Sequence, residues 1–333
     1  METNQELRIE ALPSNAKELK NLEWSKILFQ EKDWNIKFTS VEKNKVTGIT
    51  VHNGDLQTFV DFSYKQLLAR IYNIESQEPI KHKAYASVLE SIQRDYTPYL
   101  YGEAGTGKNI ICEQVASELG LTFYSQNSVQ TKFDLIGYSD ANGEYVPTPF
   151  YEAFTKGGLF FIDELDNSDP QAIKSLNQAI GSRYYSFPKI GMVHAHENFR
   201  CITAGNTCGR GAGDYVANVI DPSTLNRFRF IRVDYDENIE MRISMGNKEL
   251  VDFFHAIRKA SKEAGYYIVA SYRGLKGVSE FEDSADTHEL IEQFVTQGMD
   301  ADEINTIYGR FDSEFAKSNT YAKALKKLAQ TLQ

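Results

Sequence analysis

The sequence is poor in cysteine and lacks the segments that direct a chain to a membrane. Its 333 residues contain three cysteines, Cys112, Cys201 and Cys208. They are odd in number and show no C-x-x-C spacing, so we expect reduced thiols. The first residues, Met1 to Glu6, are polar and acidic, unlike a signal peptide, and no apolar run approaches the length of a membrane span. We therefore expect a cytoplasmic protein without a membrane partner.

A surplus of positive charge is also missing. The net charge is −10, which argues against a surface devoted to wrapping nucleic acid, although a ring of acidic subunits can still carry a basic pore. The composition, 41% hydrophobic and 25% charged, is that of an ordinary globular protein. The length allows two or three domains with a well-buried core.

One motif dominates what is present. The stretch Gly102-Glu103-Ala104-Gly105-Thr106-Gly107-Lys108-Asn109 lies between the short apolar strand 99–101 and a helical pattern that begins at Ile110. Its glycines let successive backbone N–H groups point at phosphate oxygens, the helix N-terminus adds a positive dipole, and Lys108 can reach the β and γ phosphates. Together with its strand and helix, the motif predicts a nucleoside triphosphate site built by residues 102–110.

The last residue of the motif departs from its usual form. Asn109 stands where a Ser or Thr hydroxyl normally coordinates Mg²⁺. An amide oxygen is a ligand that Mg²⁺ accepts, but the side chain is longer and octahedral geometry is strict. Binding of ATP is therefore a firmer prediction than the rate of its hydrolysis.

A pair of acids follows a second apolar strand. Residues 159–162 are apolar without alternation, as in a strand buried on both faces of a parallel sheet, and Asp163 and Glu164 come at its carboxyl end. A doubly wound sheet binds its ligand at that edge. We expect Asp163 to hold Mg²⁺ and Glu164 to take a proton from the attacking water. Asp163, Asp166 and Asp169 lack the spacing of a calcium loop.

Three further polar residues fit the same chemistry. Asn206 follows the buried strand 199–204 and could orient the attacking water, although alone it would more often be a turn residue. Arg227 precedes the next strand, 231–233, and could reach a phosphate on a neighbouring subunit. Arg273 lies among the C-terminal helical patterns, where a lid could carry it towards bound nucleotide.

Local signals predict several other elements. An N-terminal group of two or three antiparallel strands occupies residues 34–51, with a helix starting near Leu67. Asn142-Gly143 predicts a type I′ hairpin, and residues 184–193 a second hairpin. Asp169 and Pro170 predict the start of a helix that ends at Gly181, and Asp300 with Glu303 a capping box. The glycines at 209–213 predict a mobile loop.

These elements suggest three segments. We expect a small α+β module in residues 1–80, an α/β nucleotide-binding core in residues 81–235, and a helical lid with C-terminal helices in residues 236–333. The first segment either contacts a partner or extends the packing of the core, and the sequence does not separate the two. The fold class is therefore α/β.

The assembled motifs resemble the AAA+ superfamily of ring-forming ATPases. Within it they are similar to the MoxR-like and dynein-related branch, which includes the small ATPase subunit of cobaltochelatase and its phage-encoded relatives. The residues that carry the resemblance are 102–109, 134–137, 157–164, 204–207, 225–228 and 271–273. They span residues 85–280 and leave 1–80 uncovered.

The resemblance implies a parallel sheet of order 5-1-4-3-2 with a helical lid, ATP and Mg²⁺ as ligands, and a hexameric ring of identical subunits. It implies roles for Asn206 as sensor 1, for Arg227 as a finger acting in trans, and for Arg273 as sensor 2. The hairpin at 132–151 would be the helix-2 insert that faces the pore. Asn109 departs from the family pattern.

Three functions compete. The first is a ring that hydrolyses ATP and remodels a partner protein that the sequence does not identify. The second is an assembly module that binds ATP but hydrolyses it little, because Asn109 holds the metal poorly. The third is a DNA-translocating motor, which the acidic balance disfavours.

Overall fold

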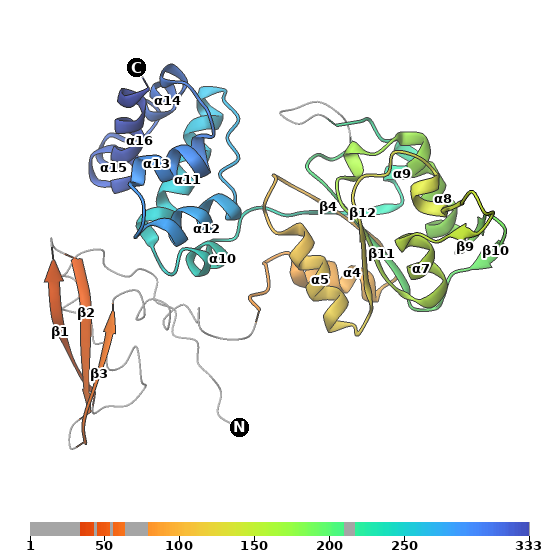
Figure 1. Ribbon diagram of the computed structural model, residues 1–333, viewed down its shortest axis with the longest axis horizontal. Coiled ribbons are helices and arrows are strands. Elements are labelled where there is room, and N and C mark those ends of the chain that lie inside the picture. Colours follow the sequence, from red (N-terminus) through yellow and green to blue (C-terminus); the bar gives the residue numbers. More distant parts are fainter. Residues whose placement is uncertain (1–33, 43–44, 54–55, 64–78, 210–216, 333) are drawn as a thin grey trace. The chain divides into compact units, whose positions relative to one another are not determined.

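The computed structural model describes residues 34–42, 45–53, 56–63, 79–209 and 217–332, the first three ranges by their backbone alone. Contacts divide the chain into two compact units, Ile80–Asp236 on the one hand and Met1–Pro79 with Glu237–Gln333 on the other (Figure 1). Each is described by itself below. No helix in the described ranges is both long and apolar enough to cross a membrane.

The unit Ile80–Asp236, called the core unit below, is built on a five-stranded parallel sheet. Its strands are β4 (Thr97–Tyr101), β5 (Phe123–Gln126), β8 (Gly158–Ile162), β11 (Phe199–Gly205) and β12 (Phe228–Arg232). They lie in the order β12-β4-β11-β8-β5 and are parallel throughout. Numbered within the sheet this is 5-1-4-3-2, and the predicted α/β fold is confirmed.

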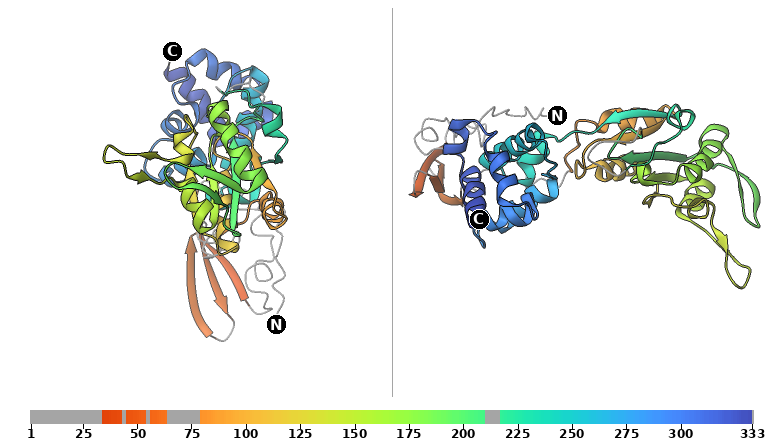
Figure 2. Two further views of the ribbon diagram at one scale, coloured as in Figure 1. Left: turned by 90° about the vertical axis from the view of Figure 1, so that its right-hand side faces the viewer. Right: turned by 90° about the horizontal axis from the view of Figure 1, so that it is seen from above.

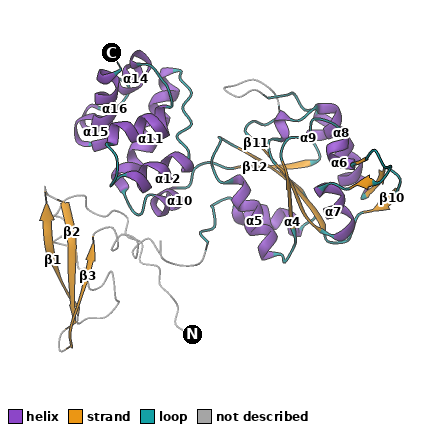
Figure 3. Cartoon of the chain, viewed as in Figure 1, coloured by secondary structure: helices purple, strands orange, loops and turns teal. Residues whose placement is uncertain are grey.

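Helices cover both faces of this sheet, which makes a three-layer sandwich (Figure 3). Alternate residues of β8 serve opposite faces, as a strand requires: Leu159 and Phe161 pack with one set of helices, Phe160 and Ile162 with the other. The first set is α4 (Tyr85–Gln93) and α5 (Lys108–Glu118), and the second is α7 (Pro149–Lys156) and α8 (Pro170–Ser182). Burial on both faces explains why the strand is continuously apolar.

Two predicted boundaries are wrong, although the elements exist. Helix α8 begins as expected, with the Asp169 carboxylate accepting from Gln171 N and Ala172 N at 2.9 Å. It continues through Gly181 and ends at Ser182, and the following residue, Arg183, caps it with a φ of 54°. Strand β12 starts three residues earlier than residue 231, because it lies at the sheet edge and its half-buried Arg229 interrupts the apolar pattern.

Two hairpins project from the body of the core unit (Figure 2). The first pairs β6 (Tyr138–Ser139) with β7 (Tyr145–Val146) and follows the short helix α6 (Phe133–Ile136). The second pairs β9 (Tyr184–Phe187) with β10 (Gly191–His194). Lys189 Nζ donates to Gly143 O, which joins the tip of one hairpin to the tip of the other. Both hairpin predictions are confirmed.

The turn type predicted for the first hairpin is wrong. Gly143 has a φ of 83°, but Asn142 is not left-handed, as a type I′ turn would require. Instead Gly143 N donates to Asp140 O at 3.0 Å, and the Asp140 carboxylate accepts from Asn142 N and Glu144 N at 2.9 and 2.7 Å. This aspartate stabilises an ordinary turn closed by a left-handed glycine.

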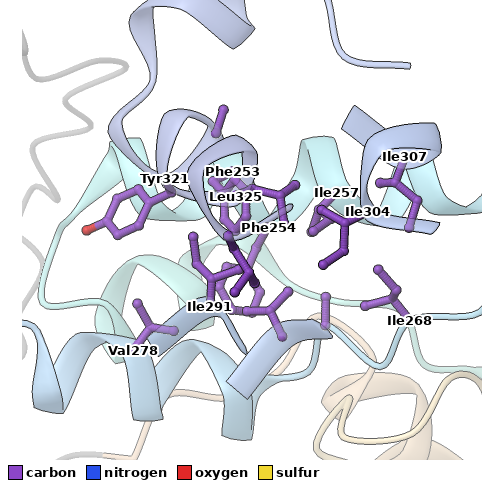
Figure 4. Close-up of a cluster of buried hydrophobic side chains, with 14 of the residues drawn as sticks. Phe253, Phe254, Ile257, Ile268, Val278, Ile291, Ile304, Ile307, Tyr321 and Leu325 are labelled. Atoms are coloured by element: carbon purple, nitrogen blue, oxygen red, sulfur yellow. The ribbon is translucent and has the colours of Figure 1, made fainter. Parts of the chain in front are cut away.

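The helical region Glu237 to the C-terminus packs around one apolar cluster. Figure 4 shows its centre, where Phe253, Phe254, Ile291 and Leu325 meet. The helices are α10 (Glu237–Ile243), α11 (Lys248–Ala264), α12 (Tyr272–Phe281), α13 (Thr287–Ile291), α14 (Ala301–Tyr308), α15 (Ser313–Ser318) and α16 (Thr320–Thr331). The predicted capping box at Asp300 and Glu303 is confirmed, and α16 is packed into the cluster.

Helix α12 is not predicted by its apolar periodicity, because two glycines interrupt it. A β-carbon at Gly274 would lie 2.6 Å from Phe294 O, and one at Gly277 would lie 2.5 Å from the Phe294 ring. Phe294 reaches this position from one turn of π-helix, Glu292–Thr296. The glycines that weaken the helical signal are therefore the ones that let α12 pack closely.

A separate three-stranded antiparallel sheet precedes the core unit in the chain. It consists of β1 (Trp34–Glu42), β2 (Lys45–Asn53) and β3 (Leu56–Ser63), with β2 in the centre. The predicted antiparallel strands are confirmed. The predicted helix near Leu67 and the predicted loop at 210–213 lie outside the described residues.

Candidate nucleotide site

The loop after β4 has room only for glycine at its first position. A β-carbon on Gly102 would stand 2.1 Å from Val233 O, because the chain leaving β12 is hydrogen bonded to Tyr101 O through Val233 N at 2.8 Å. Gly105 and Gly107 have φ of 74° and 87°, which residues with a β-carbon rarely adopt. Gly107 caps α5. The backbone therefore forms the turn that a phosphate-binding loop requires.

Lys108 is buried at the centre of this loop, with 7% of its surface exposed. Its Nζ donates to Gly102 O at 2.8 Å, to Glu103 O at 3.0 Å and to Asn206 Oδ1 at 3.2 Å. Burial lowers the pKa of the ammonium, and the nearby carboxylates, above all Asp163, oppose this shift. A cation held away from water beside a glycine-rich turn is suited to contact phosphate.

Asn109 and Asp163 meet at the same edge of the sheet. Asn109 Nδ2 donates to Asp163 Oδ2 at 2.9 Å, although the two residues are 54 positions apart in the chain. The other carboxylate oxygen, Asp163 Oδ1, accepts from Glu164 N at 2.9 Å. An amide at this position thus donates to the carboxylate, as a hydroxyl would, and keeps an oxygen of its own for a hard cation.

Glu164 has a backbone conformation that a glutamate rarely adopts. Its φ of 50° and ψ of 44° lie in the left-handed region. This conformation costs roughly 1–3 kcal/mol for a residue with a β-carbon, and such strained residues cluster at active sites. The side chain is exposed, and its Oε2 accepts from Asn167 Nδ2 at 3.2 Å. The carboxylate therefore leaves the end of β8 towards solvent, where a water molecule can reach it.

Asp166 is a residue of this site that the sequence pattern does not reveal. It is 1% exposed, and its Oδ2 accepts from Thr207 N at 2.7 Å and from Thr207 Oγ1 at 2.8 Å. Tyr99 donates from its hydroxyl to Thr207 O at 3.1 Å. These bonds hold the turn that carries Asn206. The signal in the sequence is only a third acid after Asp163 and Glu164, and its burial depends on tertiary structure.

Tyr235 is a second residue that the sequence pattern does not reveal. Its hydroxyl donates to Ala104 O in the phosphate loop at 2.9 Å. The adjoining residues are also held: His82 Nε2 lies 2.8 Å from Asp234 O, and Asp236 Oδ2 accepts from Lys83 N at 2.8 Å. Burial lowers the pKa of His82. The end of the core unit is thereby attached to the loop.

The comparisons with known proteins agree with this geometry. Residues 99–228 match the family model described as the AAA domain of the dynein-related subfamily. This part of the chain is an AAA domain. AAA domains hydrolyse ATP, and the protein is accordingly an ATPase. The match does not reach the narrower MoxR-like or cobaltochelatase groups.

Solved structures with weak similarity include NtrX from Brucella abortus, at 13% identity and a TM-score of 0.43 over 77% of this chain and 69% of that chain. A structure of NtrX in complex with ATP has 13% identity and a TM-score of 0.41, over 80% and 72% of the two chains. A putative ATPase from Cytophaga hutchinsonii has the same identity and TM-score over 80% and 86%. Similarity at this level does not bear on function.

Within the AAA domain, Arg227 is not at the phosphate loop. It is exposed at the amino end of β12, and its Nη1 would lie 2.5 Å from a β-carbon on Gly181 at the end of α8. The phosphate loop follows the carboxyl end of the adjacent strand β4, which is five residues long. At about 3.3 Å per residue the two ends are roughly 17 Å apart. Arg227 therefore does not serve the loop of its own chain.

Arg273 belongs to the helical unit and is exposed in the first turn of α12. The start of this helix is fixed from within the unit, because Ser271 caps it and Arg258 Nε donates to Ala270 O at 2.7 Å. Arg258 Nη1 also donates to the fully buried Glu240 at 2.6 Å. The structure thus orders the helix that carries Arg273, while its role remains a prediction.

Proposed function

We propose that the protein is a ring-forming AAA ATPase of the MoxR-like type, which couples ATP binding and hydrolysis to the remodelling of a partner protein. The observation that carries the proposal is the meeting of Lys108, Asn109, Asp163 and Asn206 at one edge of the sheet. Three separate strand ends supply these residues. An ordinary strand-turn-helix connection would not require such convergence.

The residues present fit a triphosphate and Mg²⁺. The glycine-lined turn at 102–107 and the buried Lys108 would hold the phosphates, with Ile110 in the helix that follows. Asn109 and Asp163 offer oxygens of the kind that Mg²⁺ takes as ligands. When bound, the ion would neutralise charge on the phosphates.

In hydrolysis, each of the remaining side chains of the site would have a distinct role. Glu164 would accept a proton from the attacking water, since its carboxylate is exposed beside Asp163. Asn206 would orient that water, since it already contacts Lys108. Arg227 of a neighbouring copy would stabilise charge on the γ-phosphoryl oxygens, and Arg273 would report the nucleotide to the helical unit.

The position of Arg227 supports a closed ring. A finger on one edge of the sheet and a phosphate loop on the other can combine only between copies, and a head-to-tail interface of this kind generates a ring when its rotation closes. We expect six copies, as in the family that the motifs resemble.

The two hairpins support contact with a partner protein. They present apolar side chains to solvent, with Tyr138 53%, Ile190 42% and Met192 59% exposed. Lys189 joins the tips of the two hairpins. Exposed apolar side chains on projecting elements favour contact with a protein over contact with a polyanion such as DNA.

The test is ATP turnover measured as phosphate release. Glu164→Gln removes the general base and is expected to lower turnover by about 10²- to 10⁴-fold. The matched control is Glu113→Gln, the same change at an exposed position of α5, which should leave turnover intact. Equal rates for wild type and Glu164→Gln would reject the proposal. Particle mass with and without ATP tests the ring separately.

A further inference from the structure

We infer that Asp166 and Thr207 form a positioning pair that holds Asn206 against Lys108 and so sets the rate of the hydrolytic step. The inference rests on the proposed function. Asp166 lies outside the motifs that carry the family resemblance, and Thr207 is the last residue of one of them, 204–207, with no role of its own assigned. Asp166 lies just beyond the acids that follow β8, whereas Thr207 lies just beyond Asn206 at the end of β11.

Thr207 is bonded through its backbone and its side chain. Its N and its Oγ1 both donate to Asp166 Oδ2, at 2.7 and 2.8 Å, and its O accepts from the Tyr99 hydroxyl at 3.1 Å. Its Oγ1 also accepts from Gly209 N at 3.2 Å. Because every polar atom of Thr207 is hydrogen bonded, this turn has little conformational freedom. Asn206, the preceding residue, is held in place with it.

Asp166 is in turn fixed to the end of β8. It lies in a 3-10 turn (Leu165–Asn167) and is 1% exposed, and its own O accepts from Asn218 N at 2.7 Å. A buried carboxylate is costly unless it is hydrogen bonded, so its bonds to Thr207 carry much of its stabilisation. Breaking them would release both ends of the pair.

The second oxygen of the carboxylate takes no part in the bonds to Thr207. Asp166 Oδ1 is buried and has no hydrogen-bond partner among the described residues. A β-carbon on Gly205 would lie 2.9 Å from this oxygen and 2.3 Å from the Tyr99 hydroxyl. Asp166 also acts on Lys108, whose pKa it raises against the lowering effect of burial.

The chain of contacts therefore runs from the acid strand to the lysine. Asp166 holds Thr207, Thr207 directly follows Asn206 in the chain, and Asn206 Oδ1 accepts from Lys108 Nζ at 3.2 Å. A side chain that orients water must be placed to within about 1 Å, since a misplacement of that size can lower a rate by up to about 10²-fold. Asp166 and Thr207 supply this precision without touching the substrate.

The test measures kcat and nucleotide affinity separately in the full chain. Thr207→Val keeps the shape of the side chain but removes its hydroxyl, and we expect kcat to fall by about 10-fold or more, within the 10²-fold limit. The dissociation constant for a fluorescent ATP analogue should change by less than about threefold, because the phosphate loop is untouched. Thr207→Ser restores the hydroxyl and should recover kcat. Asp166→Asn keeps one acceptor oxygen for Thr207 but loses the charge, and it should lower kcat less than Thr207→Val does.

A matched control lies on the same strand. Thr203 is fully buried and donates to Pro98 O at 3.3 Å, so Thr203→Val is the same loss of a hydroxyl away from Asn206. It should leave kcat within about threefold of wild type. In an Asn206→Ala background, Thr207→Val should have no further effect beyond about threefold, because the residue that it positions is gone.

The inference is overturned if Thr207→Val keeps the wild-type kcat, if Thr203→Val loses as much, or if the losses of Thr207→Val and Asn206→Ala multiply. Should Asp166→Asn fail to fold, Thr207→Val decides alone. These failures occur with an active wild type and an inactive Glu164→Gln. A wild type that releases no phosphate overturns the proposed function and this inference together.

Discussion

The two edges of the five-stranded sheet carry opposite chemistry. The carboxyl edge gathers one buried lysine, Lys108, with the acids Asp163, Glu164 and Asp166. The amino edge gathers arginines: Arg227 stands before β12, and a pocket there is lined by Arg183, Arg200 and Asp95. One edge is equipped to hold a triphosphate, and we propose that the other approaches the triphosphate of a neighbouring copy. Neither edge has both functions.

This difference between the edges follows from the direction of the strands in a parallel sheet. All five strands run the same way, so residues after strands collect at one edge and residues before strands collect at the other. A strand of five residues keeps the edges roughly 17 Å apart. If Arg227 assists hydrolysis, it does so on another copy.

The largest expected effect on ATP turnover comes from removing the arginine at the amino edge of the sheet. Arg227→Ala should lower turnover by about 10³- to 10⁵-fold, the range for an arginine that stabilises charge in phosphoryl transfer. Arg94→Ala is the matched control, because Arg94 is an exposed arginine that directly follows α4 and, among the described residues, forms an ion pair only with Glu90, at 2.9 Å. It should retain full turnover.

Mixing two inactive variants, one altered at each edge of the sheet, tests whether the two edges act on different copies. We expect Arg227→Ala and Glu164→Gln each to be inactive alone, whereas a proposed mixed ring would contain interfaces where an intact Arg227 faces an intact Glu164. Random mixing in equal amounts makes roughly a quarter of the interfaces complete, so phosphate release should return. A mixture as inactive as its components would place both residues on one copy and contradict the split site.

An intermediate effect is expected within the carboxyl edge. Asn109→Ala removes the amide that bonds to Asp163 at 2.9 Å. We expect the Mg²⁺ concentration for half-maximal turnover to rise by about 10- to 100-fold, as for lost neighbours of metal ligands. Asn109→Thr should keep the Mg²⁺ concentration for half-maximal turnover near the wild-type value, since a hydroxyl can donate to the same carboxylate. A sharp rise in turnover above wild type for Asn109→Thr would instead favour the weakly hydrolysing assembly module.

The smallest expected effect is a pH dependence of nucleotide binding. Burial lowers the pKa of Lys108 in the free protein, and contact with phosphates would raise it. Binding then takes up a proton, so affinity is highest at low pH and falls as pH rises through the lowered pKa. The decrease should stay below about tenfold from pH 8.5 to 9.5, since the uptake of one proton changes the affinity by at most about tenfold per pH unit.

Titration calorimetry in buffers of different ionisation enthalpy measures this proton uptake. Lys108→Arg is the control, because a guanidinium keeps its charge over the whole range. The variant should bind ATP with a weaker dependence on pH. Equal pH dependence in the two proteins would assign the effect to another group.

The predictions from the sequence succeeded where the signal was local or strongly periodic. The phosphate loop, the strand before Asp163, the capping box at Asp300 and the two hairpins depend on neighbours in the chain, and the structure contains each as an element. The type of the first turn was wrong because Asp140, two residues before Asn142, accepts from the backbone and stabilises another turn.

Helix α12 was missed for a related reason. Gly274 and Gly277 lower the helical signal, yet they are required by Phe294, which lies 17 residues or more further along the chain. The positioning role of Asp166 was missed because its partner Thr207 is 41 residues away. A contact across that separation leaves no periodic trace in the sequence.

Residue order alone determined which groups stand at the ends of strands, because apolar runs of four or five residues and the polar residues that follow them can be counted directly. Tertiary structure alone decided which of those ends face each other: it brought Asn109 to Asp163, Thr207 to Asp166 and Asn206 to Lys108, and it left Arg227 at the opposite edge. The physical reason is that strand order and helix packing depend on how side chains are buried on both faces of the sheet. Contacts between residues far apart in the chain determine that burial.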